Sequence, residues 1–133
     1  MQNRVSKHRK KTGAFKRTVL LMDGHSVVRE GLASIINDTP DLVVCGQSDS
    51  AADAMSAVSA LNPDAAVVNI SLDGSIGLEL IQTLKATYPR LAIVASVLHD
   101  EEELAKLAMK AGASSFITRG NVIEPVRRAL ASA

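Results

Sequence analysis

Two kinds of hydrophobic pattern alternate along the chain. Short continuous apolar runs, each closed by glycine or polar residues, are typical of strands that are buried on both faces. Between them, apolar residues recur every three or four positions, which is the pattern of an amphipathic helix. The apolar runs predict strands at 18–22, 42–46, 65–70, 91–97 and 115–118, and the periodic segments predict helices at 27–36, 50–61, 76–88, 100–111 and 122–131.

Local signals predict where the helices begin, end and face the core. Ser26 is a predicted N-cap, Pro89 and Gly112 are predicted to end helices, and Pro125 is tolerated because it falls in a first turn. Residues 37–40 and 62–63 are also predicted to end helices. The predicted inner faces are Val27, Val28, Gly31, Leu32, Ile35 and Ile36 in the first helix, Ala54, Met55, Val58 and Leu61 in the second, and Ile76, Leu80, Ile81 and Leu84 in the third.

Strands that alternate with helices predict an α/β fold with a parallel sheet covered on both faces. Right-handed crossovers then bring all strand ends to one edge of the sheet, where ligands of such folds collect. The residues at that edge are Asp23 and Gly24, Gln47 and Ser48, Asn69 to Ser71, Ser96, and Thr118 and Arg119. The third strand therefore delivers an amide, Asn69, to the centre of the predicted site.

The composition narrows the class of protein. A chain of 133 residues is long enough for one domain, and 47% hydrophobic with 2% aromatic residues predicts a core of aliphatic side chains. No apolar run reaches the length of a membrane span, and the N-terminus lacks the apolar region of a secretory signal, so we expect a cytoplasmic protein. Cys45 is the one cysteine. It is interpreted as a small hydrophobic residue on a strand, with a redox role as the alternative.

Charge divides the chain into two parts. Residues 1–17 hold seven basic groups and no acidic one, which leaves a net charge of −6 for the remainder. We expect 1–17 to be a flexible basic arm, and 18–133 to be the folded domain. The arm is interpreted as a solubilising tail or as a weak contact for nucleic acid or an acidic partner.

Three segments of the chain resemble a known family. They are Val-Leu-Leu-Met-Asp-Gly-His-Ser-Val-Val-Arg-Glu-Gly-Leu at 19–32, Asn-Pro-Asp-Ala-Ala-Val-Val-Asn-Ile-Ser-Leu-Asp-Gly at 62–74, and Ala-Gly-Ala-Ser-Ser-Phe-Ile-Thr-Arg-Gly at 111–120. In order and spacing they are similar to the receiver domains of bacterial two-component response regulators, which belong to the CheY-like superfamily, and within them to the NarL/FixJ-like subfamily. The resemblance runs from about 18 to 131 and implies the flavodoxin-like strand order 2-1-3-4-5.

The resemblance also implies a set of roles, and several positions depart from it. The family holds Mg²⁺ with an acidic pair, but here Asp23 is followed by Gly24. Asn69 stands where an Asp accepts phosphate from a histidine kinase, and Arg119 stands where a Lys is expected. Ser96 and Phe116 match the hydroxyl and aromatic switch positions. An amide is a poor nucleophile and cannot carry phosphate, so the resemblance implies a degenerate receiver.

Other residues are candidates to replace the altered positions. With two carboxylates missing, Asp23 and the Ser71 carbonyl are weak candidates for metal ligands, and no bound cofactor is expected. Arg119 is expected either to pair with Asp23 or Asn69, or to point to solvent. Asp73 is interpreted as a turn residue, His25 as a residue at a helix start, and His99 as a loop residue.

These observations predict a non-enzymatic, phosphorylation-independent signalling module that is part of a transcriptional regulator. The alternatives are a receiver that is phosphorylated on a neighbouring carboxylate, and a sensor of a small ligand in the vacated acidic pocket. We expect a protein partner or a second copy to bind the C-terminal face, residues 101–133. By resemblance, a DNA-binding output domain would lie outside this chain.

Overall fold

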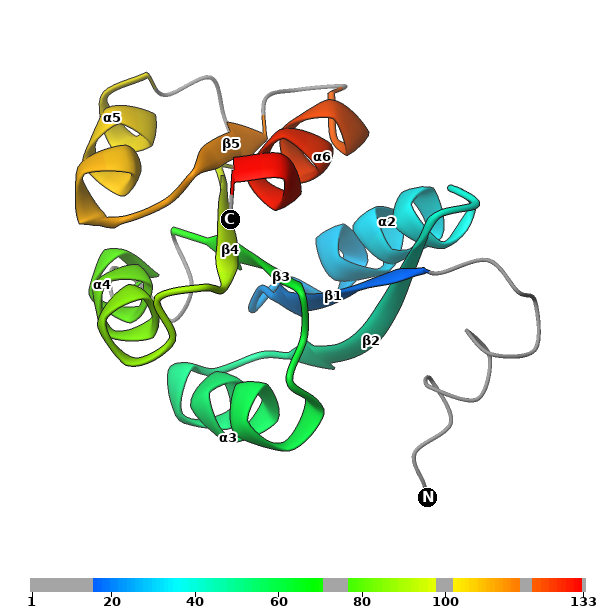
Figure 1. The fold of residues 1–133 in the computed structure, drawn as a ribbon, viewed down its shortest axis with the longest axis horizontal. Coiled ribbons are helices and arrows are strands. Elements are labelled where there is room, and N and C mark those ends of the chain that lie inside the picture. The colour runs from blue at the N-terminus through cyan, green and yellow to red at the C-terminus, as the bar shows by residue number, and fades with distance from the viewer. Residues whose placement is uncertain (1–15, 71–76, 98–101, 118–120, 133) are drawn as a thin grey trace.

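The computed structural model describes residues 16–70, 77–97, 102–117 and 121–132 (Figure 1). Its strands are β1 (Arg17–Met22), β2 (Leu42–Ser48), β3 (Ala65–Asn69), β4 (Ala92–Ser96) and β5 (Ser115–Ile117). Its helices are α2 (Ser26–Asn37), α3 (Ala51–Leu61), α4 (Gly77–Thr87), α5 (Glu102–Ala111) and α6 (Ile123–Ser132). The strands form one parallel sheet in the order β2-β1-β3-β4-β5, which confirms the predicted order.

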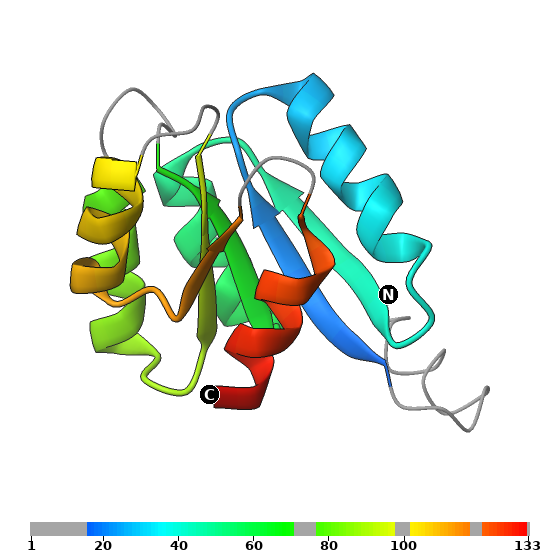
Figure 2. The same cartoon turned by 90° about the horizontal axis from the view of Figure 1, so that it is seen from above.

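Helices cover the sheet on both faces. Helices α2 and α6 pack on one face, and α3, α4 and α5 pack on the other (Figure 1). Figure 2 shows the strands running in a common direction, so that their carboxyl ends share one edge. The central strands β3 and β4 are buried at every residue and apolar up to their last one, as the continuous apolar runs predicted, whereas the edge strand β2 is half-buried over most of its length.

The core consists of two aliphatic layers, one on each side of the sheet. Alternate residues of β1 divide between them, since Leu20 and Met22 face α3 to α5 whereas Val19 and Leu21 face α2 and α6. Strand β2 contains an irregularity of register opposite Val19 and Leu20, so that Cys45 has no residue opposite it in β1. Cys45 is half-buried and packs against the core, in keeping with its interpretation as a small hydrophobic strand residue.

The start of α2 differs from the prediction. The N-cap is His25, which makes no side-chain capping hydrogen bond, and Ser26 is the first helical residue. The prediction that Ser26 is the N-cap was therefore wrong. The loop from β1 is short, and the Asp23 carboxylate accepts the backbone N–H of His25 at 2.8 Å. That contact turns the chain into the helix one residue earlier, and the His25 carbonyl accepts the first helical bond from Arg29.

The predicted inner faces of α2 and α3 are too wide. In α2 only Leu32, Ala33 and Ile36 are buried, while the side chain of Val27 is 80% exposed. Gly31 and Ile35 are exposed as well, and Leu61 at the end of α3 is 43% exposed. A helix lying on a sheet buries only the narrow arc that faces the strands, and periodicity alone does not give the width of that arc. In α4 the predicted Leu80, Ile81 and Leu84 are buried, and Ile76 lies outside the described residues.

Local contacts and backbone conformation define the other helix ends. Ser50 caps α3 by accepting the Asp53 N–H at 3.2 Å, and Asn62 ends it in the left-handed conformation at φ 49°. Gly112 follows α5 at φ 130°, a conformation that favours glycine, and confirms the predicted stop. Pro125 is the third residue of α6, inside the first turn as predicted.

Two polar contacts join distant parts of the chain. At the amino edge of the sheet, Asp64 Oδ2 accepts the Thr18 N–H at 2.8 Å and lies 3.7 Å from Arg17 Nε. On the surface, Arg127 of α6 donates to the Asp41 carboxylate at 2.7 Å. This hydrogen bond lowers the pKa of Asp41 below its ordinary value of 3.8 and raises the pKa of Arg127. None of the described helices is long and apolar enough to cross a bilayer.

Candidate functional site

The polar residues at the carboxyl ends of β1 and β3 lie side by side. Strands β1 and β3 are neighbours in the sheet, but β1 is followed by α2 on one face and β3 by α4 on the other face. Such a switch point leaves a crevice above the strand ends. Asp23 follows β1 and Asn69 ends β3. Both side chains are almost completely buried, and a buried charge or amide has to find partners there.

Asn69 and Asp23 are joined directly. Asn69 Nδ2 donates to Asp23 Oδ2 at 2.9 Å, in a contact that is buried. A carboxylate only accepts hydrogen bonds, so the amide must turn its nitrogen, and not its oxygen, toward Asp23. The amide therefore occupies one carboxylate oxygen with a neutral donor.

The other carboxylate oxygen is also occupied. Asp23 Oδ1 accepts the backbone N–H of His25 at 2.8 Å and lies 3.0 Å from His25 Nδ1. The imidazole ring itself is 48% exposed, so it closes the outer side of the carboxylate. Donors from Asn69 and His25 thus lie at both carboxylate oxygens and stabilise a negative charge on Asp23.

Arg29 extends this cluster toward β2, a contact that the sequence pattern does not predict. Its Nη1 donates to the backbone oxygen of Asp23 at 2.7 Å, and its Nε donates to Gln47 Oε1 at 3.1 Å. A guanidinium in the first turn of α2 thus links the ends of β1 and β2. The one available signal was its place in the turn after Asp23, since Gln47 had been predicted at the same edge.

Ser96 joins the same edge, but Phe116 faces the other way. Ser96 ends β4, is paired in register with Asn69, and is buried. Residues paired in register point to the same face of a sheet, so Ser96 stands beside Asn69 on the α2 and α6 face. Phe116 is paired with Ala95 and packs against the layer of α3 to α5. The two predicted switch residues therefore lie on opposite faces.

Several predicted positions carry no structural statement. Ser71, Asp73, His99 and Arg119 lie outside the described residues. Gly24 is exposed in the bend after β1 and has no carboxylate to offer. Across the described ranges, no group of three or more His, Cys, Asp or Glu side chains is arranged to hold a metal ion.

Comparison with known proteins defines the class. The family model for the response regulator receiver domain matches residues 19–130, and the chain belongs to this family. Receiver domains of this kind are part of two-component response regulators, as the resemblance had implied.

Individual relatives agree with that assignment. The chain is 36% identical over 101 residues to the DNA-binding transcriptional activator DevR/DosR of Mycobacterium tuberculosis, covering 76% of this chain and 46% of the relative. It is 30% identical over 112 residues to the response regulator GacA of Pseudomonas aeruginosa, covering 84% and 52%. The chain thus spans about half the length of the curated relatives it matches.

Solved structures show the same fold. The two-component response regulator of the LuxR family from Aurantimonas sp. superposes with a TM-score of 0.81 at 25% identity, over 88% of this chain and 86% of that one. The receiver domain of NtrX from Brucella abortus gives a TM-score of 0.78 at 27% identity, over 86% and 99%.

Proposed function

We propose that this receiver domain signals by protein contact and does not accept phosphate. The observation that best supports this proposal is the buried hydrogen bond from Asn69 Nδ2 to Asp23 Oδ2. By resemblance to the family, Asn69 stands at the phosphoacceptor position. An amide there has no anionic oxygen to attack phosphorus, and its nitrogen is already engaged with Asp23.

The same contact argues against a tightly bound Mg²⁺ ion. Mg²⁺ requires oxygen ligands in near-octahedral geometry, and the family supplies them from carboxylates. Here Gly24 has no side-chain oxygen, Asn69 turns a nitrogen toward Asp23, and both Asp23 oxygens accept hydrogen bonds. These residues do not fit the ion, so hydrogen bonds take over its role of compensating the Asp23 charge.

A transcriptional role is the proposed output. DevR/DosR is described as a DNA-binding transcriptional activator, and this chain covers 46% of its length. In the proposal the receiver controls a DNA-binding domain that lies outside these residues. The domain itself performs no catalysis, and the basic arm at 1–17 adds at most a weak contact with nucleic acid.

The proposed partner surface is the C-terminal face, 101–133. Helix α5 exposes two large apolar side chains on this face, Leu107 at 47% and Met109 at 40%. Contact with another protein would remove these side chains from water. A second copy of the chain is the proposed occupant.

Acetyl phosphate with Mg²⁺ tests the proposal on the intact chain. Intact-mass spectrometry should find no added phosphoryl group on the wild type. The variant Gly24→Asp, Asn69→Asp, Arg119→Lys restores the family pattern and should gain one, because nucleophile, metal ligand and Lys are then present.

Two other outcomes of this experiment would be informative. A phosphorylated wild type would contradict the proposal and favour an acceptor such as Asp73, which peptide mapping would locate. An unmodified triple variant beside an unmodified wild type would show that the three positions do not explain the loss.

A further inference from the structure

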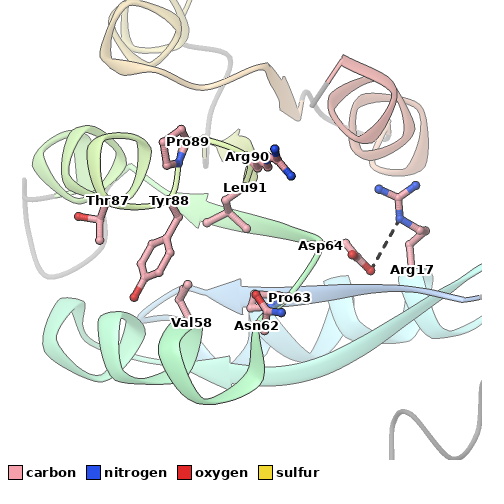
Figure 3. Close-up of a pocket in the computed structure, with 10 residues that line it drawn as sticks. All are labelled: Arg17, Val58, Asn62, Pro63, Asp64, Thr87, Tyr88, Pro89, Arg90 and Leu91. Carbon is pink, nitrogen blue, oxygen red and sulfur yellow. Dashed lines mark ion pairs between the residues drawn. The ribbon is translucent and has the colours of Figure 1, made fainter.

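A cavity of about 740 Å³ opens at the amino edge of the sheet, the edge opposite Asp23 and Asn69. It lies between the loop that joins α3 to β3 and the loop that joins α4 to β4, with Arg17 of β1 at its rim (Figure 3). Its volume is in the range of small-molecule sites in proteins. The vacated acidic pocket that the sequence predicts as a ligand site lies at the other edge.

One part of the cavity wall is apolar. Val58 and Leu91 are buried beneath it, and Tyr88 and Pro63 stand beside them. In Figure 3 the side chain of Tyr88 extends toward α3, and Val58 lies beside its ring. An aromatic ligand could be buried against this wall and contact the ring of Tyr88.

The other part carries charge. Arg17, Asp64 and Arg90 line it, and in Figure 3 Arg17 and Asp64 lie away from Tyr88. Asp64 is hydrogen-bonded within the protein, since its Oδ2 accepts from the Thr18 N–H at 2.8 Å and from the Thr18 hydroxyl at 3.2 Å. Arg17 Nε lies 3.7 Å from Asp64 Oδ2, and in Figure 3 the two terminal nitrogens of Arg17 point away from Asp64.

Arg90 completes the arrangement. Among the described residues, none is hydrogen-bonded to or ion-paired with its guanidinium, and the residue is exposed. Two guanidinium groups and one carboxylate leave a single positive charge over the cavity. That balance favours a monoanion over a doubly charged phosphate, because Asp64 repels the second charge. The planar guanidinium group matches a carboxylate.

From these observations we propose that the amino-edge cavity binds a small organic carboxylate with an aromatic body. The carboxylate pairs with Arg90 and the terminal nitrogens of Arg17, and the aromatic body lies against Tyr88, Pro63 and Leu91. This site is separate from the carboxyl-edge cluster, so it does not depend on whether Asn69 accepts phosphate.

Indole-3-acetate is the probe, and indole-3-acetamide is its neutral isostere. The ¹⁵N-labelled full chain is titrated with each at constant ionic strength. Indole-3-acetate should give saturable shifts at Asn62, Tyr88 and Leu91, with no shift at Asp23 or in the Asn69 side-chain amide. The acetamide should bind at least about tenfold more weakly, because it lacks the charge that pairs with the guanidinium groups.

Charge-matched variants complete the test. Arg90→Gln should weaken indole-3-acetate at least about tenfold, and Arg128→Gln, at an exposed position of α6, should leave the affinity unchanged. The proposal is overturned if indole-3-acetate gives no saturable shift at millimolar concentration, or if Arg90→Gln and Arg128→Gln behave alike. Shifts centred on Asp23 and Asn69, or equal shifts with inorganic phosphate, would overturn it as well.

Discussion

A single amide determines the character of the carboxyl-edge cluster. Asp23 is buried, so each of its oxygens needs a donor or a cation. Asn69 supplies an N–H at 2.9 Å, and His25 supplies the donor for the other oxygen. An Asp at position 69 would instead place a second carboxylate beside the first, and the pair would then require a metal ion or a proton.

Asn69→Asp should therefore lower the free energy of unfolding near neutral pH by about 1–3 kcal/mol, since it replaces a donor by a like charge in a buried contact. Added Mg²⁺ should recover part of that loss in the variant and leave the wild type unchanged. Urea denaturation with and without Mg²⁺ measures both effects.

Asn121→Asp is the matched control, because it makes the same chemical change at an exposed position. It should cost less than about 0.5 kcal/mol, as surface substitutions usually do. Equal stability of Asn69→Asp and the wild type would show that the Asn69 to Asp23 hydrogen bond does not stabilise the site.

At the scale of elements, the approach of α4 to β3 holds Asn69 in place. Gly77 begins α4, and a Cβ atom built there would lie 2.4 Å from Ile70 Cα and 2.6 Å from the Asn69 carbonyl oxygen. Both neighbours are backbone atoms, which cannot rotate away as a side chain can. The glycine therefore lets the helix start directly against the end of the strand that carries Asn69.

Gly77→Ala should destabilise the domain by about 1–3 kcal/mol, because the new methyl group forces α4 away from the end of β3. The displacement should also shift the NMR signals of the Asn69 side-chain amide. Chemical denaturation and a ¹⁵N spectrum measure the two effects.

Gly31→Ala is its control in α2. Nothing lies within 4 Å of a Cβ atom built at Gly31, so the higher helix propensity of alanine should raise stability by up to about 1 kcal/mol. If both alanine variants were stabilised, the close approach at Gly77 would carry no cost.

At the scale of the whole molecule, the sheet separates two edges with different chemistry. The carboxyl edge is closed by Asp23, Asn69 and His25, whereas the amino edge is tied by Thr18 and Asp64 and opens into the cavity. The proposed partner surface lies on the flank that carries α5. The three proposals can therefore be tested separately on one small domain.

We expect the chain to self-associate through this flank, and Leu107→Glu to raise the dimer dissociation constant at least about tenfold, because it places a charge in an apolar contact. Val27→Glu is the control, since it changes a more exposed apolar side chain on α2. Sedimentation equilibrium measures both. A monomeric wild type, or equal effects of the two variants, would contradict the dimer and leave another protein as the occupant.

The order of elements could be predicted from the sequence because it depends on local pattern. Strands buried on both faces have to be apolar throughout, and helix ends at Asn62, Pro89 and Gly112 follow from backbone conformation. The position of Asp23 and Asn69 at one edge followed as well, since parallel strands with right-handed crossovers leave no other arrangement. The sequence alone thus determined the fold and the presence of Asp23 and Asn69 at the carboxyl edge.

Contacts between distant residues could be decided only by the tertiary structure. Packing decides which side-chain atom of Asn69 faces Asp23, and it brings Arg29 to Gln47. It also decides that α2 is buried along Leu32 and Ile36 but not at Val27. The cavity also depends on the tertiary structure, because its walls come from segments that are far apart in the chain. Periodicity reports which residues prefer to be buried, whereas packing decides which neighbours they meet.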